Sequence, residues 1–218
     1  MDSEQALKKL NSMSNKKNAE GMKRFGITGQ KVLGIQIYKL RAMARQTGKN
    51  HRLALKLWDS GIHEAMLLAS MIDEPENVSE KQMEKWAKGF ESWDLCDQVC
   101  MNLFFKVKFC GKKIFDWAER KEEFVKRAGF SLIAVLAVHN KELNDRDFDK
   151  YLGLIVKHAD DERNYVKKAV NWALRNIGKR NEKLRKKAIK TAEKIKKLNS
   201  KSARWIANDA LKELSHNK

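Results

Sequence analysis

The chain has 218 residues, which is long enough to bury a substantial core and does not require a second domain, so we predict one domain over residues 1–218. With 1 Pro, 11 Gly and only short runs of β-branched residues, the composition excludes a sheet protein and favours an all-α fold. The formal net charge of +18, from 46 Lys and Arg against 28 Asp and Glu, indicates a polyanionic partner. The sequence lacks both the apolar core of a signal peptide and the run of roughly 20 apolar residues that a transmembrane helix needs, so we expect an intracellular protein.

The N-terminal half predicts short helices separated by clear boundary signals. LALKLW at residues 53–58 and MLLASMI at residues 66–72 have the apolar content of helices that pack in a core. Pro75 ends the second of these helices, and Ser79 begins the next one with Gln82 in the position of a capping box.

Several predicted helices share one pattern at intervals of about 40 residues. Val125, Val166 and Ala203 begin equivalent segments, which are 41 and 37 residues apart. A fainter copy of the same pattern begins at Ile62. Each copy follows another apolar segment, so the repeating unit is predicted to be an outer helix, a short turn and an inner helix.

Helix pairs of this kind bury their apolar stripes only against neighbouring pairs. The predicted fold is therefore a curved, HEAT-like solenoid of antiparallel helix pairs with a concave basic face. Residues 179–218 hold 14 Lys and Arg against 4 Asp and Glu, so this part of the surface is predicted to be strongly basic. The alternative, an irregular helical bundle with chance similarity between its helices, is also all-α.

The segment ESWDLCDQVC at residues 91–100 brings an aromatic residue and an acid together. If Ser92 caps the following helix, Trp93 and Asp97 lie four residues apart on one face of its first turns. An indole beside a carboxylate is suited to binding or stabilising a positive charge. The alternative is that Trp93 packs in the core and Asp97 is an ordinary surface acid.

The repeat register adds four candidates in the C-terminal half. Lys168 is equivalent to Arg127 of the preceding repeat. Trp172 follows Lys168 by four residues, and Arg175 follows Trp172 by three. These side chains are predicted to share the concave face, where the cations would contact a phosphate backbone. Alternatively, Trp172 is buried between repeats.

These segments resemble the AlkD-like DNA glycosylases of alkylation repair over roughly residues 20–180. Trp93-Asp94-Leu95-Cys96-Asp97 is similar to the family's Trp-Asp-x-x-Asp segment, and Arg127 lies in an Arg-Ala context similar to its DNA-contacting arginine. KKAVNWALR around Trp172 is similar to the family's second tryptophan block. Phe25 stands where the family has a tyrosine, so a hydroxyl group is absent there.

The resemblance implies a monofunctional DNA glycosylase of base excision repair. Its substrates would be cationic alkylpurines in duplex DNA, such as N3-alkyladenine and N7-alkylguanine, excised without an enclosing base pocket. Asp97 would be the catalytic carboxylate and Trp93 and Trp172 the aromatic walls. Arg127, Lys168, Arg175 and Phe25 complete the predicted DNA-binding set. Because a cationic purine leaves readily, the carboxylate is needed mainly for the oxocarbenium-like sugar.

We predict no metal and no cofactor, because the sequence has no Cys, His or acidic cluster at metal-ligand spacing. Cys96, Cys100 and Cys110 are predicted to be reduced and to act as small buried hydrophobic residues. The expected partner is double-stranded DNA that contains alkylated bases, bound by a cytoplasmic monomer that associates with the nucleoid through DNA. Two alternatives remain open: a non-catalytic HEAT-repeat relative that recognises bent or branched DNA, and a solenoid that binds proteins.

Overall fold

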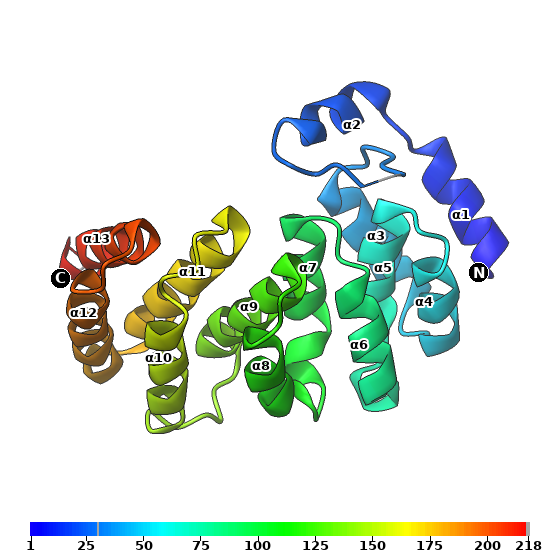
Figure 1. Ribbon diagram of the computed structural model, residues 1–218. Coiled ribbons are helices and arrows are strands. Elements are labelled where there is room, and N and C mark those ends of the chain that lie inside the picture. The colour runs from blue at the N-terminus through cyan, green and yellow to red at the C-terminus, as the bar shows by residue number, and fades with distance from the viewer. Residues whose placement is uncertain (30, 217–218) are drawn as a thin grey trace. The chain divides into compact units, whose positions relative to one another are not determined.

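In a computed structural model, which describes residues 1–29 and 31–216, the chain forms two compact units, Met1–Phe109 and Cys110–Lys218. Every regular element among these described residues is a helix (Figure 1), which confirms the predicted all-α fold. The single domain predicted over residues 1–218 stays a prediction.

The first unit is a stack of short helices around α5 (Figure 1). Its elements are α1 Ser3–Ser12, α2 Lys16–Lys23, α3 Ile37–Thr47, α4 His51–Trp58, α5 His63–Ile72, η1 Pro75–Asn77, α6 Glu80–Lys88, α7 Trp93–Asn102 and η2 Phe104–Lys106. α5 packs against α3, α4 and α7. All of its residues except Met71 are buried, as expected for a helix covered on every side.

Boundary signals of the first unit fall close to the predicted positions. α5 ends at Ile72, three residues before Pro75, and the Ser79 hydroxyl caps α6 by accepting from the Gln82 backbone N–H at 3.1 Å. α6 lacks the reciprocal bond of the predicted capping box, from the Ser79 N–H to the Gln82 side chain; the Gln82 amide N–H donates to the buried Asp73 carboxylate at 2.6 Å. Gln82 therefore ties α6 to the end of α5.

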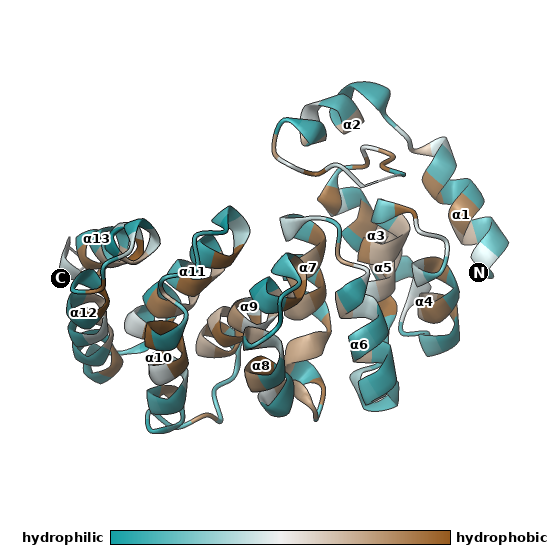
Figure 2. Cartoon of the chain, in the orientation of Figure 1, coloured by the Kyte–Doolittle hydropathy of each residue, from teal (hydrophilic) through white to brown (hydrophobic). Residues whose placement is uncertain are grey.

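The second unit consists of three helix pairs (Figure 1). Its elements are α8 Cys110–Ala118, α9 Glu123–His139, α10 Asp147–Lys157, α11 Asn164–Arg180, α12 Glu182–Lys196 and α13 Lys201–His216. α9, α11 and α13 are the inner helices of the predicted register, and α11 packs against both of the others. Figure 2 shows α12 as mainly hydrophilic, whereas α9 is apolar along much of its length.

The repeat register holds in the core of the second unit. Val125, Val166 and Ala203, which are equivalent in the register, are all at most 1% exposed. Side chains bridge neighbouring repeats at spacings within one residue of the register: Asn171 donates to Asp209, 38 residues away, and Asn176 donates to the Ala134 carbonyl, 42 residues away. The regular repeat therefore places each inner helix against the next one.

Candidate functional site

α7 begins at Trp93, as the sequence predicted, and a hydrogen bond holds the Trp93 indole in place. Trp93 is half-buried, and its Nε1–H donates to the backbone carbonyl oxygen of Phe25 at 2.8 Å. Ser92 precedes the helix in an extended conformation, but its hydroxyl donates to the Asp94 carboxylate at 2.6 Å instead of capping a backbone N–H. The Trp93 ring is therefore held between its own helix and the segment that follows α2.

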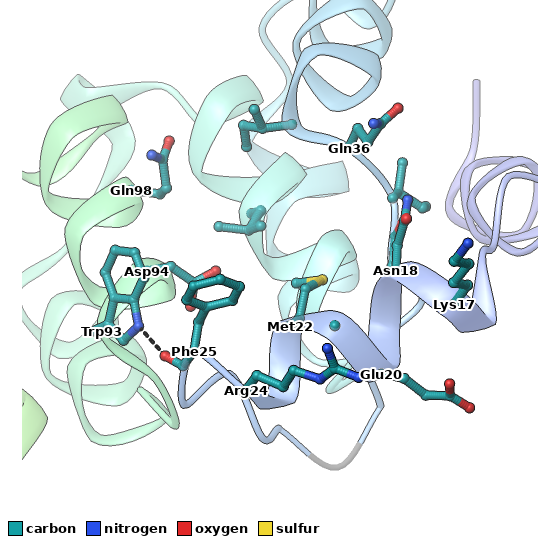
Figure 3. Close-up of a pocket in the computed structure, with 15 residues that line it drawn as sticks. Lys17, Asn18, Glu20, Met22, Arg24, Phe25, Gln36, Trp93, Asp94 and Gln98 are labelled. Carbon is teal, nitrogen blue, oxygen red and sulfur yellow. Dashed lines mark hydrogen bonds between the residues drawn. The ribbon is translucent and has the colours of Figure 1, made fainter.

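Trp93 lines an open groove of about 770 Å³ in the first unit (Figure 3). The groove lies among α2, the start of α3, α5 and α7. Its lining residues are Lys17, Asn18, Glu20, Gly21, Met22, Arg24, Phe25, Gly34, Ile35, Gln36, Ile37, Leu67, Trp93, Asp94 and Gln98. Phe25 is 71% exposed, so its ring stands out from the groove wall toward solvent.

The buried Glu64 carboxylate positions one side of this groove. One of its oxygens accepts from the backbone N–H groups of Gly34 and Ile35, at 2.6 and 3.1 Å, and the other accepts from Leu33 at 2.8 Å. Gly34 has a φ of +75°, and a Cβ on it would lie 2.2 Å from the Asn15 carbonyl oxygen. The loop at residues 33–35 is therefore clamped between α5 and α2, which sets where α2 and Phe25 lie.

Asp97 follows Trp93 by one turn of α7 and is 9% exposed. Among the described residues, the acids that line the groove with Trp93 are Glu20 and Asp94, and Asp97 is not one of them. The predicted approach of the Asp97 carboxylate to the Trp93 ring therefore stays a prediction.

His63, which no sequence motif singled out, lies against Asp94. His63 Nε2 is 3.0 Å from Asp94 Oδ2, and the two side chains are 3% and 16% exposed. Burial lowers the pKa of His63, but the hydrogen bond and charge of Asp94 outweigh burial and leave that pKa raised. Burial raises the pKa of Asp94, yet the hydrogen bonds from His63 and Ser92 leave it below its usual value.

The four predicted site residues of the second unit differ in how far they are exposed and in what they contact. Lys168 is exposed and Trp172 is half-buried, both on α11. Arg127 is only 6% exposed, and its guanidinium donates to the Tyr165 carbonyl at 2.6 Å. Arg127 therefore joins α9 to the first turn of α11.

Arg175 forms ion pairs with α13. Its guanidinium pairs with Glu213 and lies 3.5 Å from an Asp209 oxygen. Glu213 also pairs with Lys179. Two of the cations on this side of α11 therefore already share a carboxylate, and Lys168 is the most accessible of the predicted phosphate contacts. The predicted convergence of Trp172 with Asp97 concerns both units and stays a prediction.

No group of three or more His, Cys, Asp or Glu side chains among the described residues is placed to hold a metal ion. Nor does that part of the chain contain a helix that is both long and apolar enough to cross a membrane.

Comparison with solved structures bears on the fold. One similar structure comes from a family of proteins related to the HEAT-like repeat DNA glycosylases with affinity for branched DNA structures. The similarity covers 96% of this chain and 94% of that chain, with a TM-score of 0.80 and 18% sequence identity. A designed armadillo repeat protein in complex with a (KR)4 peptide is similar over 80% of this chain and 91% of that chain, with a TM-score of 0.41 and 17% identity. The first similarity confirms the predicted HEAT-like repeat fold.

Comparison of sequences bears on the family. No curated protein matches the chain. The model of a family described as DNA alkylation repair enzyme matches residues 6–214, a range that includes every predicted site residue. The chain therefore belongs to the DNA alkylation repair enzyme family.

Proposed function

We propose that this protein is a DNA glycosylase that hydrolyses the N-glycosidic bond of cationic alkylated purines in duplex DNA, such as N3-alkyladenine and N7-alkylguanine. The observation that carries the proposal is the arrangement of α7: a half-buried indole with a fixed N–H at its first residue, and a carboxylate one turn later at Asp97. Membership of the family supplies the general role in the repair of alkylated DNA.

Asp97 has the chemistry that this reaction needs. Alkylation at N3 or N7 makes the purine cationic, so the base departs with little acid assistance and leaves an oxocarbenium-like sugar. A carboxylate near the anomeric carbon stabilises that charge and orients the attacking water. Because Asp97 is 9% exposed, its charge is weakly screened by solvent, which strengthens this electrostatic effect.

The other predicted residues have supporting roles in the proposal. The indoles of Trp93 and Trp172 attract the cationic lesion, at about 0.5 to 2 kcal/mol per contact. Lys168 and Arg127 contact phosphates, as does Arg175 once phosphate replaces Glu213 as its partner. The exposed Phe25 ring makes an apolar contact with the DNA. Selection by charge needs no enclosing pocket, so neutral lesions are poor substrates.

The second candidate function is non-catalytic binding of bent or branched DNA. It is favoured by the low exposure of Asp97 and Arg127, at 9% and 6%, which limits their access to a substrate. The solved protein with affinity for branched DNA structures shares the fold. A basic surface without a reacting carboxylate would serve this function equally well.

Mass spectrometry of the bases released from methylated duplex DNA separates these candidates. The glycosylase proposal expects release of 3-methyladenine or 7-methylguanine at a rate above the spontaneous one, and background release of uracil from uracil-containing duplex. Background release of all three bases, together with tight binding of a four-way junction, would favour the second candidate. Absence of DNA binding even at low salt would favour a solenoid that binds proteins.

A further inference from the structure

The groove of the first unit contains Phe25 and Trp93, which the proposed function uses, and polar or charged side chains that it does not use, among them Lys17, Arg24, Asp94 and Gln98. Its volume of about 770 Å³ lies within the range of roughly 300 to 1,000 Å³ that is typical of small-molecule sites. The wall is partly aromatic, from Phe25 and Trp93, and partly aliphatic, from Ile37 and Leu67. Figure 3 shows Phe25 and Trp93 on the same side of the groove, with the Trp93 nitrogen directed at the Phe25 backbone. A planar aromatic ligand is the kind of group that such a wall binds.

The α7 side of the groove offers hydrogen-bond acceptors. Gln98 Oε1 is buried and accepts no hydrogen bond from any described residue. Leaving such an acceptor unsatisfied is unfavourable, and a ligand removes the penalty by donating to it once the Gln98 side chain turns its buried oxygen toward the groove. Asp94 precedes Gln98 by four residues, so both lie on one face of α7, and both line the groove. Each Asp94 oxygen already has a hydrogen-bond partner, Ser92 Oγ or His63 Nε2, and keeps a second lone pair for a ligand. A ligand suited to this face therefore presents N–H donors.

The rim of the groove carries cations. Lys17 and Arg24 are exposed residues of α2 and its C-terminal cap, and both line the groove. Glu20 is an acid on the same rim. With Asp94 counted, the charged lining of the groove is balanced, but Lys17 and Arg24 are exposed and can contact a phosphate group attached to the ligand.

We propose that this groove binds one unpaired nucleotide of a DNA strand, with guanine preferred. The base stacks on Phe25 and Trp93, and the attached phosphate lies against Lys17 and Arg24. Guanine is preferred because its Watson–Crick edge has adjacent N1–H and N2–H donors for Asp94 and Gln98, whereas thymine has one donor on that edge. The nucleotide has to be unpaired because pairing occupies the same edge. This inference extends the proposed function to strand junctions and does not require hydrolysis.

Fluorescence anisotropy with undamaged DNA tests the inference. The probes are three labelled duplexes of one sequence: fully paired, with one central unpaired guanine, and with one central unpaired thymine. We expect the wild-type protein to bind the guanine bulge more tightly than the thymine bulge, and the thymine bulge more tightly than the paired duplex. Phe25→Ala should weaken binding of both bulges about 5-fold or more through lost stacking, and should weaken binding of the paired duplex less, because only an apolar contact is lost there.

Gln98→Met is the decisive variant, because methionine keeps the size of the side chain and removes the acceptor. It should abolish the preference for guanine over thymine, whereas the matched control Gln46→Met, at an exposed residue of α3 outside the groove lining, should retain it. Equal wild-type affinity for the two bulges, or a guanine preference that survives Gln98→Met, would overturn the inference. If Gln98→Met does not fold, Phe25→Ala decides alone, and unchanged bulge binding overturns the inference. Loss of base release with the guanine preference intact would count against the proposed hydrolysis only.

Discussion

The indole N–H of Trp93 donates to the backbone carbonyl oxygen of Phe25 at 2.8 Å, across 68 residues of sequence. This bond connects the first turn of α7 to the segment that follows α2. It fixes the plane of the Trp93 ring through the backbone of Phe25, so the exposed Phe25 side chain remains available for contact with DNA.

Substitutions of Trp93 separate its hydrogen bond from its aromatic face. Trp93→Phe keeps a ring but removes the donor, so we expect a loss of about 1 kcal/mol in the free energy of unfolding and a modest fall in the rate of base release. Trp93→Ala removes the ring as well and should reduce that rate further. Urea denaturation and single-turnover release of 7-methylguanine measure the two effects. Release by Trp93→Ala at the wild-type rate would exclude Trp93 as a wall for the lesion.

Two glycines with similar positive φ values test how tightly α2 is held. Gly34 and Gly48 have φ values of +75° and +71°, but an added Cβ would meet the Asn15 carbonyl oxygen at 2.2 Å in Gly34 and nothing within 4 Å in Gly48. Gly48→Ala should therefore cost about 1 to 3 kcal/mol for its positive-φ backbone conformation alone. Gly34→Ala should cost a further 1 to 3 kcal/mol or so for the steric clash. Equal losses in urea denaturation would show that the loop moves away freely.

The His63–Asp94 pair predicts a pH dependence of stability. The pKa of His63 is raised above 6.5, so its contribution is fully present below that pH and is lost as the pH rises through the folded-state pKa. The pKa of Asp94 is lowered below 3.8, so its contribution is present above that pH and is lost as the pH falls through the folded-state pKa. Both contributions are therefore present at pH 5.5, whereas that of His63 is reduced at pH 8.

His63→Asn should therefore lower the free energy of unfolding more at pH 5.5 than at pH 8, with a loss of about 1.5 to 3 kcal/mol at the lower pH. Urea denaturation at both pH values provides the measurement. Asp94→Asn is the control background, because the extra loss at pH 5.5 should disappear once the carboxylate is removed. The same loss at both pH values would mean that the pair does not involve a charged histidine.

Arg127 and Lys168 are equivalent in the repeat register but differ in burial. Lys168→Met should lower the slope of log affinity against log salt concentration by about 0.9 while leaving stability almost unchanged. Arg127→Met should produce a similar fall in slope and also cost about 1 to 3 kcal/mol, because the Tyr165 carbonyl loses its donor. An unchanged salt slope for Arg127→Met would assign this arginine a structural role only.

The helices of the second unit could be predicted because their buried positions recur with a regular spacing. Val125, Val166 and Ala203 mark that spacing, and the structure buries all three. The first unit is less regular: His63 contacts Asp94 across 31 residues, whereas Asn171 contacts Asp209 across 38. The repeat spacing of the second unit therefore recurs only faintly in the sequence of the first unit.

The sequence predicted which helix carries each site residue better than it predicted what each side chain contacts. Spacing along one helix places Trp93 and Asp97 a turn apart, but it does not identify the partner that a side chain finds on another helix. The pairing of Arg175 with Glu213 and the pairing of His63 with Asp94 both join helices that are separate in sequence. Such contacts depend on how helices that are distant in sequence pack together. The spacing of residues along one helix does not reveal that packing.

The Asp97 carboxylate is proposed to promote base excision by stabilising the oxocarbenium-like sugar. The most direct test compares single-turnover release of 7-methylguanine from methylated duplex DNA by the wild-type protein, by Asp97→Asn and by the control Asp116→Asn, which alters an exposed acid of α8. We predict that Asp97→Asn lowers the rate by about 100-fold or more, as expected when charge stabilisation in the transition state is lost, and leaves DNA affinity equal to or above that of the wild type. Asp116→Asn should retain the wild-type rate. Equal rates for Asp97→Asn and the wild-type protein, with DNA binding intact in both, would contradict the claim.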